Sequence, residues 1–317
     1  MSLLAAKVRS GLVETLHNGA VAVMSRDGSL LAHAGDIDRP FFLRSAAKPF
    51  QAAVAHGLGA DLTSLELAVA SASHEGLPVH VALVGSILAR SGLDSSNLGC
   101  PPAWPISSEE VRRLARAGNT HPRPIWHNCS GKHASWLRAS QERNWPLSTY
   151  LEPEHPLQRA IIESVSALGD MSAGPVGVDG CGAPVMRTTT RVMARLFAAL
   201  GNEPTLQAVF VAMHRYPAMT SGWDKSDSRL AVVSNVAAKR GAEGCLGLAT
   251  HHGPGVAVKS WDGSEGVASV TMAAVLTEIA VGSSYVADQL SPMTRAPIPG
   301  GGREVGALES RLELKWE

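Results

Sequence analysis

Residues 20–34 read AVAVMSRDGSLLAHA, which is two apolar runs joined by a polar segment that contains Gly28. Short apolar runs on either side of a Gly-containing turn are typical of a β-hairpin. Near the other end of the chain, the runs Cys245–Thr250 and Gly255–Ser260 flank a His-His-Gly-Pro segment in the same way. Strands are therefore predicted towards both ends of the chain.

The region between these strands is predicted to be mostly helical. Thr63-x-x-Glu66 and Ser107-x-x-Glu110 match the capping box, in which each side chain satisfies a backbone donor at the other's position. Helices are expected over 64–71, 79–91, 108–117, 133–143, 155–168, 189–200 and 204–215, with one more from Val267 to about Ser284 and another that begins near Ser45. The segment Pro297–Gly302 is rich in Pro and Gly and is predicted to be a loop before a final short strand.

The order of strands, many helices, then strands and a last helix predicts an α+β fold. We expect three layers: a mainly antiparallel sheet assembled from both chain ends, flanked by helices, with a helical insert. Residues 1–317 are expected to form a single domain, with a sheet region at about 1–60 and 245–317 and a largely helical region at about 61–244. A chain of this length can bury a substantial core.

Composition narrows the class of protein. Lys and Arg together number 28, as do Asp and Glu, so the formal net charge is zero. Such a balance provides no attraction for nucleic acid or for an anionic membrane. No apolar run approaches the roughly 20 residues that span a bilayer, and no signal peptide is apparent. The four cysteines are too few for a disulfide framework. A cytoplasmic protein that binds neither nucleic acid nor membrane is predicted.

The sharpest local feature is Arg44-Ser45-x-x-Lys48. In a helix that begins near Ser45, Lys48 lies one turn later on the same face. A lysine whose pKa is lowered by burial can take the proton of a serine hydroxyl, which then becomes a nucleophile. The helix N-terminus would also favour a developing oxyanion. On these residues alone, an N-cap serine beside a solvated lysine is the more frequent explanation.

Four further segments concentrate polar and small side chains. They are Ala72-Ser73-His74-x-Gly76, His127–His133, Asp179–Gly182 and Val258-Lys259. Each also has a purely structural interpretation, namely a helix C-cap loop, a polar loop that caps a helix, a Gly-rich turn and an edge-strand lysine. Gly131 is expected to permit a tight turn before a helix that starts at about His133.

In this order, the five segments together resemble the asparaginase II family of the Rhizobium etli type, and the resemblance covers nearly the whole chain. It implies a fold similar to serine β-lactamases, penicillin-binding proteins and serine-dependent glutaminases. It also implies hydrolysis of L-asparagine to L-aspartate and ammonia through a Ser–Lys acyl-enzyme mechanism. A homodimer is implied as well.

The resemblance assigns roles to individual residues. It implies the Ser–Lys pairs Ser45–Lys48 and Ser73–Lys259, and one zinc ion per subunit bound by Cys129, Lys132 and Cys181. Asp179 is expected to hold the substrate ammonium, and Arg44, Lys132 or His133 its carboxylate. Because zinc normally takes Cys, His and carboxylate ligands, spacing alone would not suggest this metal site. The zinc is expected to organise the site and not to supply the nucleophile.

Two other classes of protein stay open. A different Ser-x-x-Lys acyl hydrolase, such as a glutaminase, a β-lactamase-like enzyme or an esterase, would share Ser45 and Lys48. A non-catalytic protein that binds zinc or a small molecule could use the same fold. The division of work between Ser45 and Ser73 is also open.

Overall fold

The structure is a computed structural model that describes residues 2–279 and 284–317. Its contacts divide the chain into two compact units. Unit 1 comprises residues 1–46, 188–202 and 229–317, and unit 2 comprises residues 47–187 and 203–228. The single domain expected over 1–317 stays a prediction.

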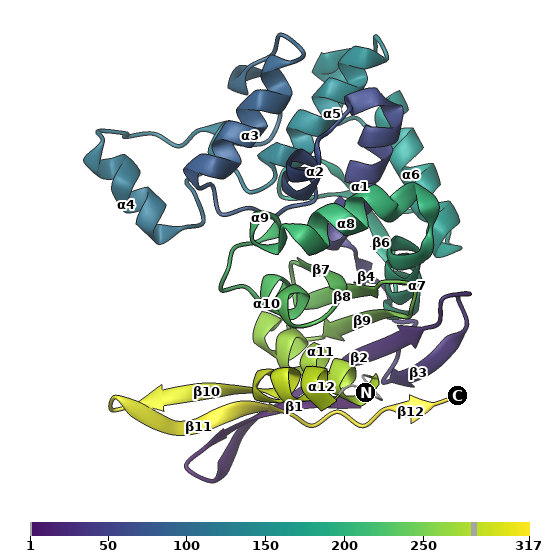
Figure 1. The fold of residues 1–317 in the computed structure, drawn as a ribbon, viewed down its shortest axis with the longest axis vertical. Coiled ribbons are helices and arrows are strands. Elements are labelled where there is room, and N and C mark those ends of the chain that lie inside the picture. Colours follow the sequence, from purple (N-terminus) through teal and green to yellow (C-terminus); the bar gives the residue numbers. More distant parts are fainter. Residues whose placement is uncertain (1, 280–283) are drawn as a thin grey trace. The chain divides into compact units, whose positions relative to one another are not determined.

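Unit 1 is built on an antiparallel sheet to which both ends of the chain contribute (Figure 1). Its strands are β1 (Ser2–Arg9), β2 (Leu12–Met24), β3 (Leu30–Ala34), β7 (Val236–Gly241), β8 (Cys245–Thr250), β9 (Gly255–Ser260), β10 (Arg295–Gly300), β11 (Arg303–Ser310) and β12 (Lys315–Trp316). The order across the sheet is β10-β11-β1-β2-β9-β8-β7, with β3 beside β2 and β12 beside β3. The hairpin predicted at 20–34 and the strand pair predicted at 245–260 are confirmed.

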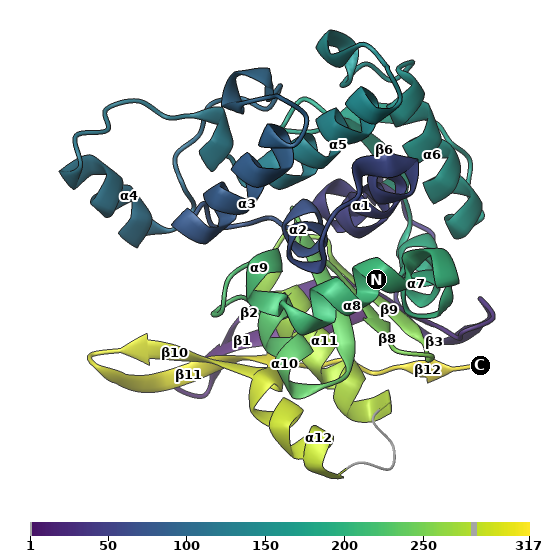
Figure 2. The same ribbon diagram turned by 45° about the horizontal axis from the view of Figure 1, so that its top comes forward.

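The sheet of unit 1 has one face of bulky side chains and one of small side chains. Along β9, Val256 and Val258 join a buried aliphatic cluster with α11 (Glu265–Ile279). Side chains alternate between the faces of a strand, so Gly255 and Ala257 face the other way. There α7 (Thr190–Asn202) packs so closely that a Cβ on Gly255 would lie 2.0 Å from the Ala198 nitrogen. Figure 2 shows both helices beside the strands.

Helix, sheet and helix thus form three layers within unit 1, and both chain ends supply the strands. The α+β class with a mainly antiparallel sheet flanked by helices is confirmed. The last long helix ends at Ile279; the predicted extension over 280–283 lies outside the described residues. A separate helix, α12 (Ser284–Leu290), follows.

Unit 2 is mainly helical. Its helices are α1 (Lys48–Ala55), α2 (Ser64–Ala70), α3 (Pro78–Ala89), α4 (Ser108–Arg116), α5 (Ser130–Glu142), α6 (Pro156–Gly169), α8 (Gln207–Arg215) and α9 (Pro217–Thr220). The chain also has the short strands β4 (Phe41–Phe42), β5 (Val176–Val178) and β6 (Pro184–Thr188), the helix α10 (Ser226–Val233), the π-helical turn His56–Ala60 and the 3₁₀ turns Arg44–Ala47, Ser95–Asn97, Pro124–Trp126, Leu147–Thr149, Pro204–Leu206 and Ser291–Thr294.

Only one of the two predicted capping boxes is complete. The Thr63 hydroxyl accepts from the Glu66 nitrogen, and the Glu66 carboxylate accepts from the Thr63 nitrogen. At α4, the Ser107 hydroxyl accepts from the Glu110 nitrogen, but the Glu110 carboxylate takes both of its side-chain bonds from Arg113. A guanidinium one turn away therefore outcompetes the N-cap backbone donor.

The start of α5 differs from the prediction. The helix begins at Ser130, three residues before His133, and Gly131 lies inside its first turn. A Cβ at Gly131 would lie 2.4 Å from the Val69 carbonyl oxygen. The glycine is therefore required by close packing of α5 on α2 and not by a turn.

The predicted loop over Pro297–Gly302 is wrong. Pro297 and Pro299 lie in β10, which pairs with β11 in an antiparallel hairpin. β10 is at the edge of the sheet, where a proline that lacks an N–H interrupts no ladder on its outer side. Among the described residues, none of the helices combines the length and apolar character needed to cross a membrane.

Candidate active site

Lys48 is the first residue of α1, and only 1% of it is exposed. Its Nζ donates to the Ala72 carbonyl at 2.6 Å, lies 3.0 Å from the Ser73 hydroxyl, and lies 3.4 Å from the Asn128 carbonyl. A carbonyl can only accept, so two N–H groups of Lys48 are directed at the two carbonyls. The remaining position of the Lys48 nitrogen faces the Ser73 hydroxyl, and the two groups lie close enough to exchange a proton.

Ser45 lies three residues before Lys48, in the helical turn Arg44–Ala47, and is half-buried. Arg44 has φ of 49°, in the left-handed region that non-glycine residues rarely adopt. The backbone therefore turns sharply just before Ser45, and such outliers gather at functional sites. Ser45 belongs to unit 1 and Lys48 to unit 2.

Each of the two predicted Ser–Lys pairs joins a residue of unit 1 to a residue of unit 2. Ser45 and Lys259 belong to unit 1, whereas Lys48 and Ser73 belong to unit 2. Those pairs stay predictions. The serine and lysine that the structure places in hydrogen-bond contact are Ser73 and Lys48.

Lys259 lies on β9, between β2 and β8, so the interpretation as an edge-strand lysine is wrong. Only 6% of it is exposed. Its Nζ donates to the carbonyls of Glu243, at 2.6 Å, and Ser260, and it lies 5.1 Å from the ring centre of Trp261 and 5.8 Å from that of Phe41. Burial lowers the pKa of Lys259 below its ordinary value. A buried lysine of this kind is suited to proton transfer or to binding an anion.

Two cysteines and a lysine converge at the start of α5. The Lys132 Nζ lies 3.2 Å from the Cys181 sulfur, and the Cys181 and Cys129 thiols are hydrogen-bonded to each other. All three side chains are at least 95% buried, and Lys132 also lies 4.4 Å from the ring centre of Trp136. Residues 49 positions apart in sequence thus meet in one polar cluster.

The thiols shift each other's pKa in opposite directions. The hydrogen bond from Cys181 holds the pKa of Cys129 well below its ordinary value, and the same bond, with burial, raises the pKa of Cys181. Burial acts to lower the pKa of Lys132, but the sulfur charges of Cys181 and Cys129 outweigh it and the pKa is raised. The cluster therefore favours one thiolate beside one ammonium.

This donor set fits a zinc ion on one condition. The two thiols are ordinary zinc ligands, whereas Lys132 can bind a metal only as a free amine, so the metal must displace its proton. Over residues 2–279 and 284–317, no group of three or more His, Cys, Asp or Glu side chains is arranged to hold a metal ion. A zinc ion at this place would therefore depend on Lys132 as its third protein ligand.

Asp179 lies in the tight turn between β5 and β6. Its nitrogen donates to the Ala183 carbonyl at 2.8 Å, and the Gly182 nitrogen donates back to the Asp179 carbonyl at 2.9 Å. Gly182 has φ of 83°, which explains the glycine at this position. The turn holds a half-buried carboxylate two residues before Cys181, and such a carboxylate could receive a substrate ammonium.

His133 is fully buried on α5. The Tyr150 hydroxyl accepts from the Gly99 nitrogen at 2.7 Å and lies 2.7 Å from His133 Nδ1. Burial lowers the pKa of His133 to about 4. A neutral imidazole offers a carboxylate a hydrogen bond at most, and no positive charge.

Two residues to which the sequence motifs gave no role, His74 and Ser130, are hydrogen-bonded to each other at 2.9 Å and fully buried. They lie next to Ser73 and Cys129 in the chain, so adjacency to predicted site residues was the signal that could have found them.

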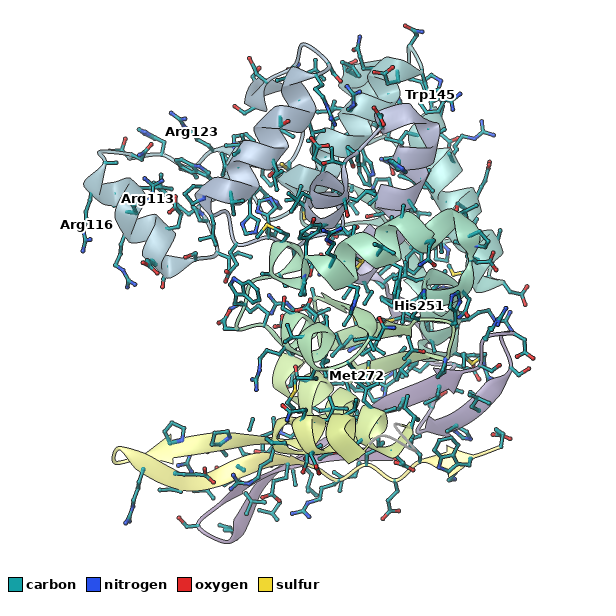
Figure 3. The ribbon with its side chains drawn as sticks, in the orientation of Figure 1. Arg113, Arg116, Arg123, Trp145, His251 and Met272 are labelled. Carbon is teal, nitrogen blue, oxygen red and sulfur yellow. The ribbon has the colours of Figure 1, made fainter. Side chains whose placement is uncertain are left out.

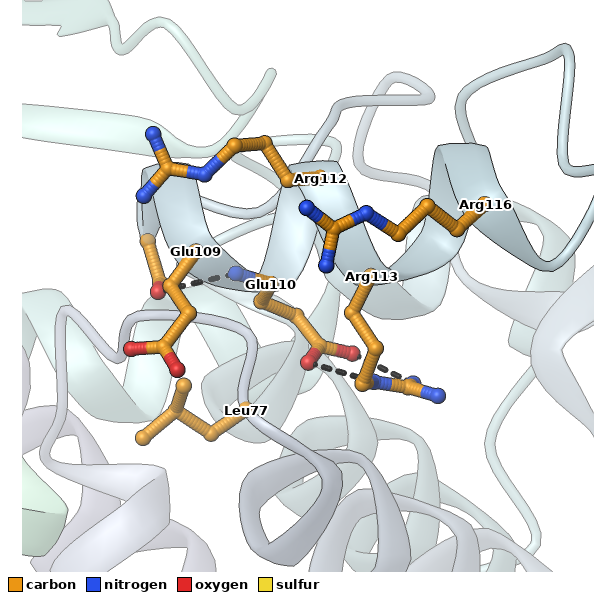
Figure 4. A pocket seen from close by; sticks show the side chains of 7 residues that line it. Leu77, Glu109, Glu110, Arg112, Arg113 and Arg116 are labelled. Atoms are coloured by element: carbon orange, nitrogen blue, oxygen red, sulfur yellow. Dashed lines mark hydrogen bonds and ion pairs between the residues drawn. The ribbon is translucent and has the colours of Figure 1, made fainter.

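A pocket of about 330 Å³ lies beside α4, away from these side chains (Figure 4). It is lined by Leu77, Ser107, Glu109, Glu110, Arg112, Arg113 and Arg116. None of these is a predicted site residue, and its charged groups include the Glu110–Arg113 ion pair at 2.6 Å. The candidate active site is therefore the set of side chains around Lys48 and Cys181.

Several solved structures are distantly similar. The crystal structure of Mglu in its native form has 16% identity and a TM-score of 0.36, over 82% of this chain and 63% of that one, so the chain spans less than two thirds of its length. A Bacillus glutaminase has 15% identity and a TM-score of 0.36 over 83% and 89% of the two chains. The probable glutaminase ybaS has 16% identity and a TM-score of 0.35 over 86% and 85%. These likenesses are too weak to bear on substrate or mechanism.

No curated protein sequence matches the chain significantly. The family model described as L-asparaginase II matches residues 5–310, which is nearly the whole chain. This match agrees with the five segments around Ser45, Ser73, Cys129, Cys181 and Lys259. The chain therefore belongs to the L-asparaginase II family, a family of amidohydrolases.

Proposed function

We propose that the protein hydrolyses L-asparagine to L-aspartate and ammonia through an acyl-enzyme. Family membership supports amide hydrolysis. The observation that carries the mechanism is the contact of Lys48 with Ser73 at 3.0 Å, in a site where two carbonyls take the other N–H groups of Lys48. A buried amine held in this way can act as a base for one hydroxyl and as an acid for another.

In the first step, neutral Lys48 takes the proton of Ser45, and the Ser45 oxygen attacks the side-chain amide carbon. The tetrahedral intermediate then collapses: the C–N bond breaks, and the nitrogen leaves as ammonia with the proton of Ser73. Ser73 recovers a proton from Lys48, which is neutral again. Water then attacks the ester carbon and gives up a proton to the same side chains, and the Ser45 oxygen leaves with a proton, which releases aspartate. The proposed role of Lys259 is to orient Ser73 for the proton transfer to the leaving nitrogen.

Substrate binding uses the remaining charged groups. Asp179 would hold the α-ammonium, and Arg44, Lys132 or His133 would hold the α-carboxylate. Arg44 and Lys132 provide positive charge, whereas His133 can provide only a hydrogen bond, because burial lowers its pKa to about 4. The two cations are therefore the stronger candidates.

The decisive experiment measures ammonia release from asparagine by the wild type and by Ser45→Ala, Ser73→Ala and Lys48→Met, with intact mass to detect an acyl adduct. Ser10→Ala, in the exposed turn after β1, is the control. Ser45→Ala should form no adduct, and Lys48→Met should lose about 10³-fold in kcat. Near-normal turnover by Ser45→Ala would contradict the nucleophile assignment, and an adduct lost only in Ser73→Ala would transfer the role to Ser73.

A substrate panel separates the proposal from its alternatives. Glutamine and a chromogenic β-lactam are compared with asparagine at equal concentration. Preferential cleavage of either would favour another Ser-x-x-Lys acyl hydrolase. Binding of asparagine without ammonia release from any amide would favour a non-catalytic binding protein.

We also propose one zinc ion per subunit, bound by Cys129, Lys132 and Cys181, that organises the site. The convergence of the three side chains supports this proposal. When bound, zinc would supply fixed positive charge beside the substrate. Metal analysis should find about one zinc per chain in the wild type and in the control Cys245→Ser, and none in Cys181→Ser. A metal-free wild type with full activity would contradict the proposal.

A homodimer is the assembly that we propose, on the basis of family membership alone. Light scattering on the purified protein measures its mass directly. A mass of one chain at working concentration would overturn this proposal.

A further inference from the structure

His74 follows Ser73 in the chain and is fully buried. Its Nδ1 accepts from the Gly76 nitrogen at 3.1 Å, and its Nε2 lies 2.9 Å from the Ser130 hydroxyl. Its own backbone nitrogen donates to the Asn128 carbonyl at 3.2 Å. Two of these three hydrogen bonds join His74 to the segment of Asn128 and Ser130, and Ser130 lies 56 positions later in the chain.

The direction of each side-chain bond follows from chemistry. A backbone N–H can only donate, so Nδ1 must be the unprotonated nitrogen and Nε2 must carry the proton. Nε2 then donates to Ser130, whose hydroxyl donates in turn to the Ile125 carbonyl at 2.9 Å. Burial lowers the pKa of His74 well below its ordinary value, so the imidazole is neutral. In the chain of hydrogen bonds from Gly76 through His74 and Ser130 to Ile125, every bond therefore runs from donor to acceptor in the same direction.

This chain joins the two halves of the candidate site within unit 2. On one side, His74 is the residue that follows Ser73 in the chain. On the other, Ser130 follows Cys129 and opens α5. The Asn128 carbonyl accepts from both the His74 nitrogen and the Lys48 Nζ. Because both side chains are fully buried, water cannot take over their hydrogen bond.

We propose that His74 is a positioning residue that, through Ser130, holds the Ser73 hydroxyl in place relative to Lys48 and the Cys129 thiol. The inference rests on the proposed amide hydrolysis. Neither side chain needs to touch the substrate. A displacement of Ser73 by about an ångström would be enough to slow proton transfer strongly.

Two near-isosteric variants separate the two bonds of the imidazole. The amide of His74→Asn reaches the position of Nδ1 and can keep the Gly76 bond only, whereas the longer His74→Gln places an N–H where Nε2 was and can keep the Ser130 bond. We expect His74→Gln to keep kcat within about tenfold of the wild type, and His74→Asn to lose about 10²-fold in kcat with little change in KM. Ser130→Ala should resemble His74→Asn, and the double variant should be no worse than either.

Ser140→Ala is the matched control. Ser140 lies on the same helix and is equally buried, but its hydroxyl has no hydrogen-bond partner among the described residues. It should keep wild-type kcat. Thermal unfolding is followed for every variant, and if His74→Asn does not fold, Ser130→Ala tests the same bond.

A ¹⁵N spectrum of the wild-type imidazoles needs no variant and should show His74 protonated on Nε2 only. A proton on Nδ1, equal kcat for His74→Asn and His74→Gln, or full activity of Ser130→Ala would each overturn the inference while leaving asparagine hydrolysis intact. A wild type that releases no ammonia from asparagine would instead overturn the proposed function, and this inference with it.

Discussion

Helices α5 and α11 are both buried, yet they bury opposite kinds of side chain. In α5, every residue from Ser130 to Ser140 is buried, and Lys132, His133 and Arg138 are among them. In α11, the buried positions are almost all aliphatic, as at Val270 and Met272.

Each large polar group of α5 has its own partner. Lys132 contacts Cys181, His133 contacts the Tyr150 hydroxyl, and Arg138 donates to the Ala60 carbonyl. A buried polar group without such a partner destabilises the fold, so a helix of this composition is retained for what the groups do. We therefore expect α11 to stabilise unit 1, and α5 to contribute more to activity than to stability.

The largest effect is expected from Lys132→Met on α5. It removes a buried cation beside the Cys181 and Cys129 thiols, and kcat/KM for asparagine should fall by about 10³-fold. The free energy of unfolding should fall by no more than about 3–5 kcal/mol, because the buried thiolate loses its cationic partner. Enzyme kinetics and thermal unfolding measure the two quantities. If stability collapsed while activity per folded molecule held, α5 would be a structural helix after all.

Met272→Ala on α11 should affect stability but hardly activity. Met272, labelled in Figure 3, lies in the aliphatic cluster between the sheet and α11. Its truncation should lower the free energy of unfolding by about 3 kcal/mol, through lost burial and the cavity left behind. Denaturant titration measures this loss, and kcat of the folded protein should stay within about twofold. A large fall in kcat would mean that α11 also positions the site.

Acid should weaken unit 2 through its buried histidines. Burial lowers the pKa of His80 to about 4, so the unfolded chain takes up a proton below about pH 6.5, whereas the folded one does not until about pH 4. The stability contributed by neutral His80 is complete above about pH 6.5 and is lost as the pH falls towards 4.

The unfolding free energy should therefore fall by about 2 kcal/mol less between pH 7 and 4.5 in His80→Gln than in the wild type. The matched control is His251→Gln on unit 1, where the histidine is exposed. An identical pH profile for His80→Gln and the wild type would show that His80 is not buried as described.

The smallest effect is expected from Thr271→Val. The Thr271 hydroxyl is buried on α11 and has no hydrogen-bond partner in the described part of the chain. Its replacement by a methyl group should raise the free energy of unfolding by up to about 1 kcal/mol and leave kcat unchanged. Chemical denaturation resolves this difference, and destabilisation would reveal a partner for the hydroxyl.

Local pattern was sufficient for much of the fold. The runs Ala20–Met24 and Gly255–Ser260 are strands, and Thr63 with Glu66 caps α2, as predicted, because apolar runs, turns and capping pairs can be read from neighbouring residues. The loop predicted at Pro297 is wrong. A proline is tolerated in β10 because this strand is at the edge of the sheet, which no local pattern reveals. The turn predicted at Gly131 is wrong, because a glycine is required there by the nearby Val69 carbonyl of another helix.

The site shows the same division. The motifs predicted Ser73, Lys48 and Cys181 as site residues, and this prediction is still to be tested. They did not identify Lys48 as the hydrogen-bond partner of Ser73, or His74 as the partner of Ser130. Those contacts join residues 25 and 56 positions apart, and no spacing rule reaches so far along the chain.

The sequence by itself determined the α+β class and the family, because periodicity, turns and motif order are properties of neighbouring residues, and it predicted which groups are reactive. Only the tertiary structure decided the partners of those groups: Ser73 for Lys48, Cys181 for Lys132, and two carbonyls and two aromatic rings for Lys259. Burial and hydrogen bonding set whether a lysine or a thiol is charged, and both arise only when distant segments pack together.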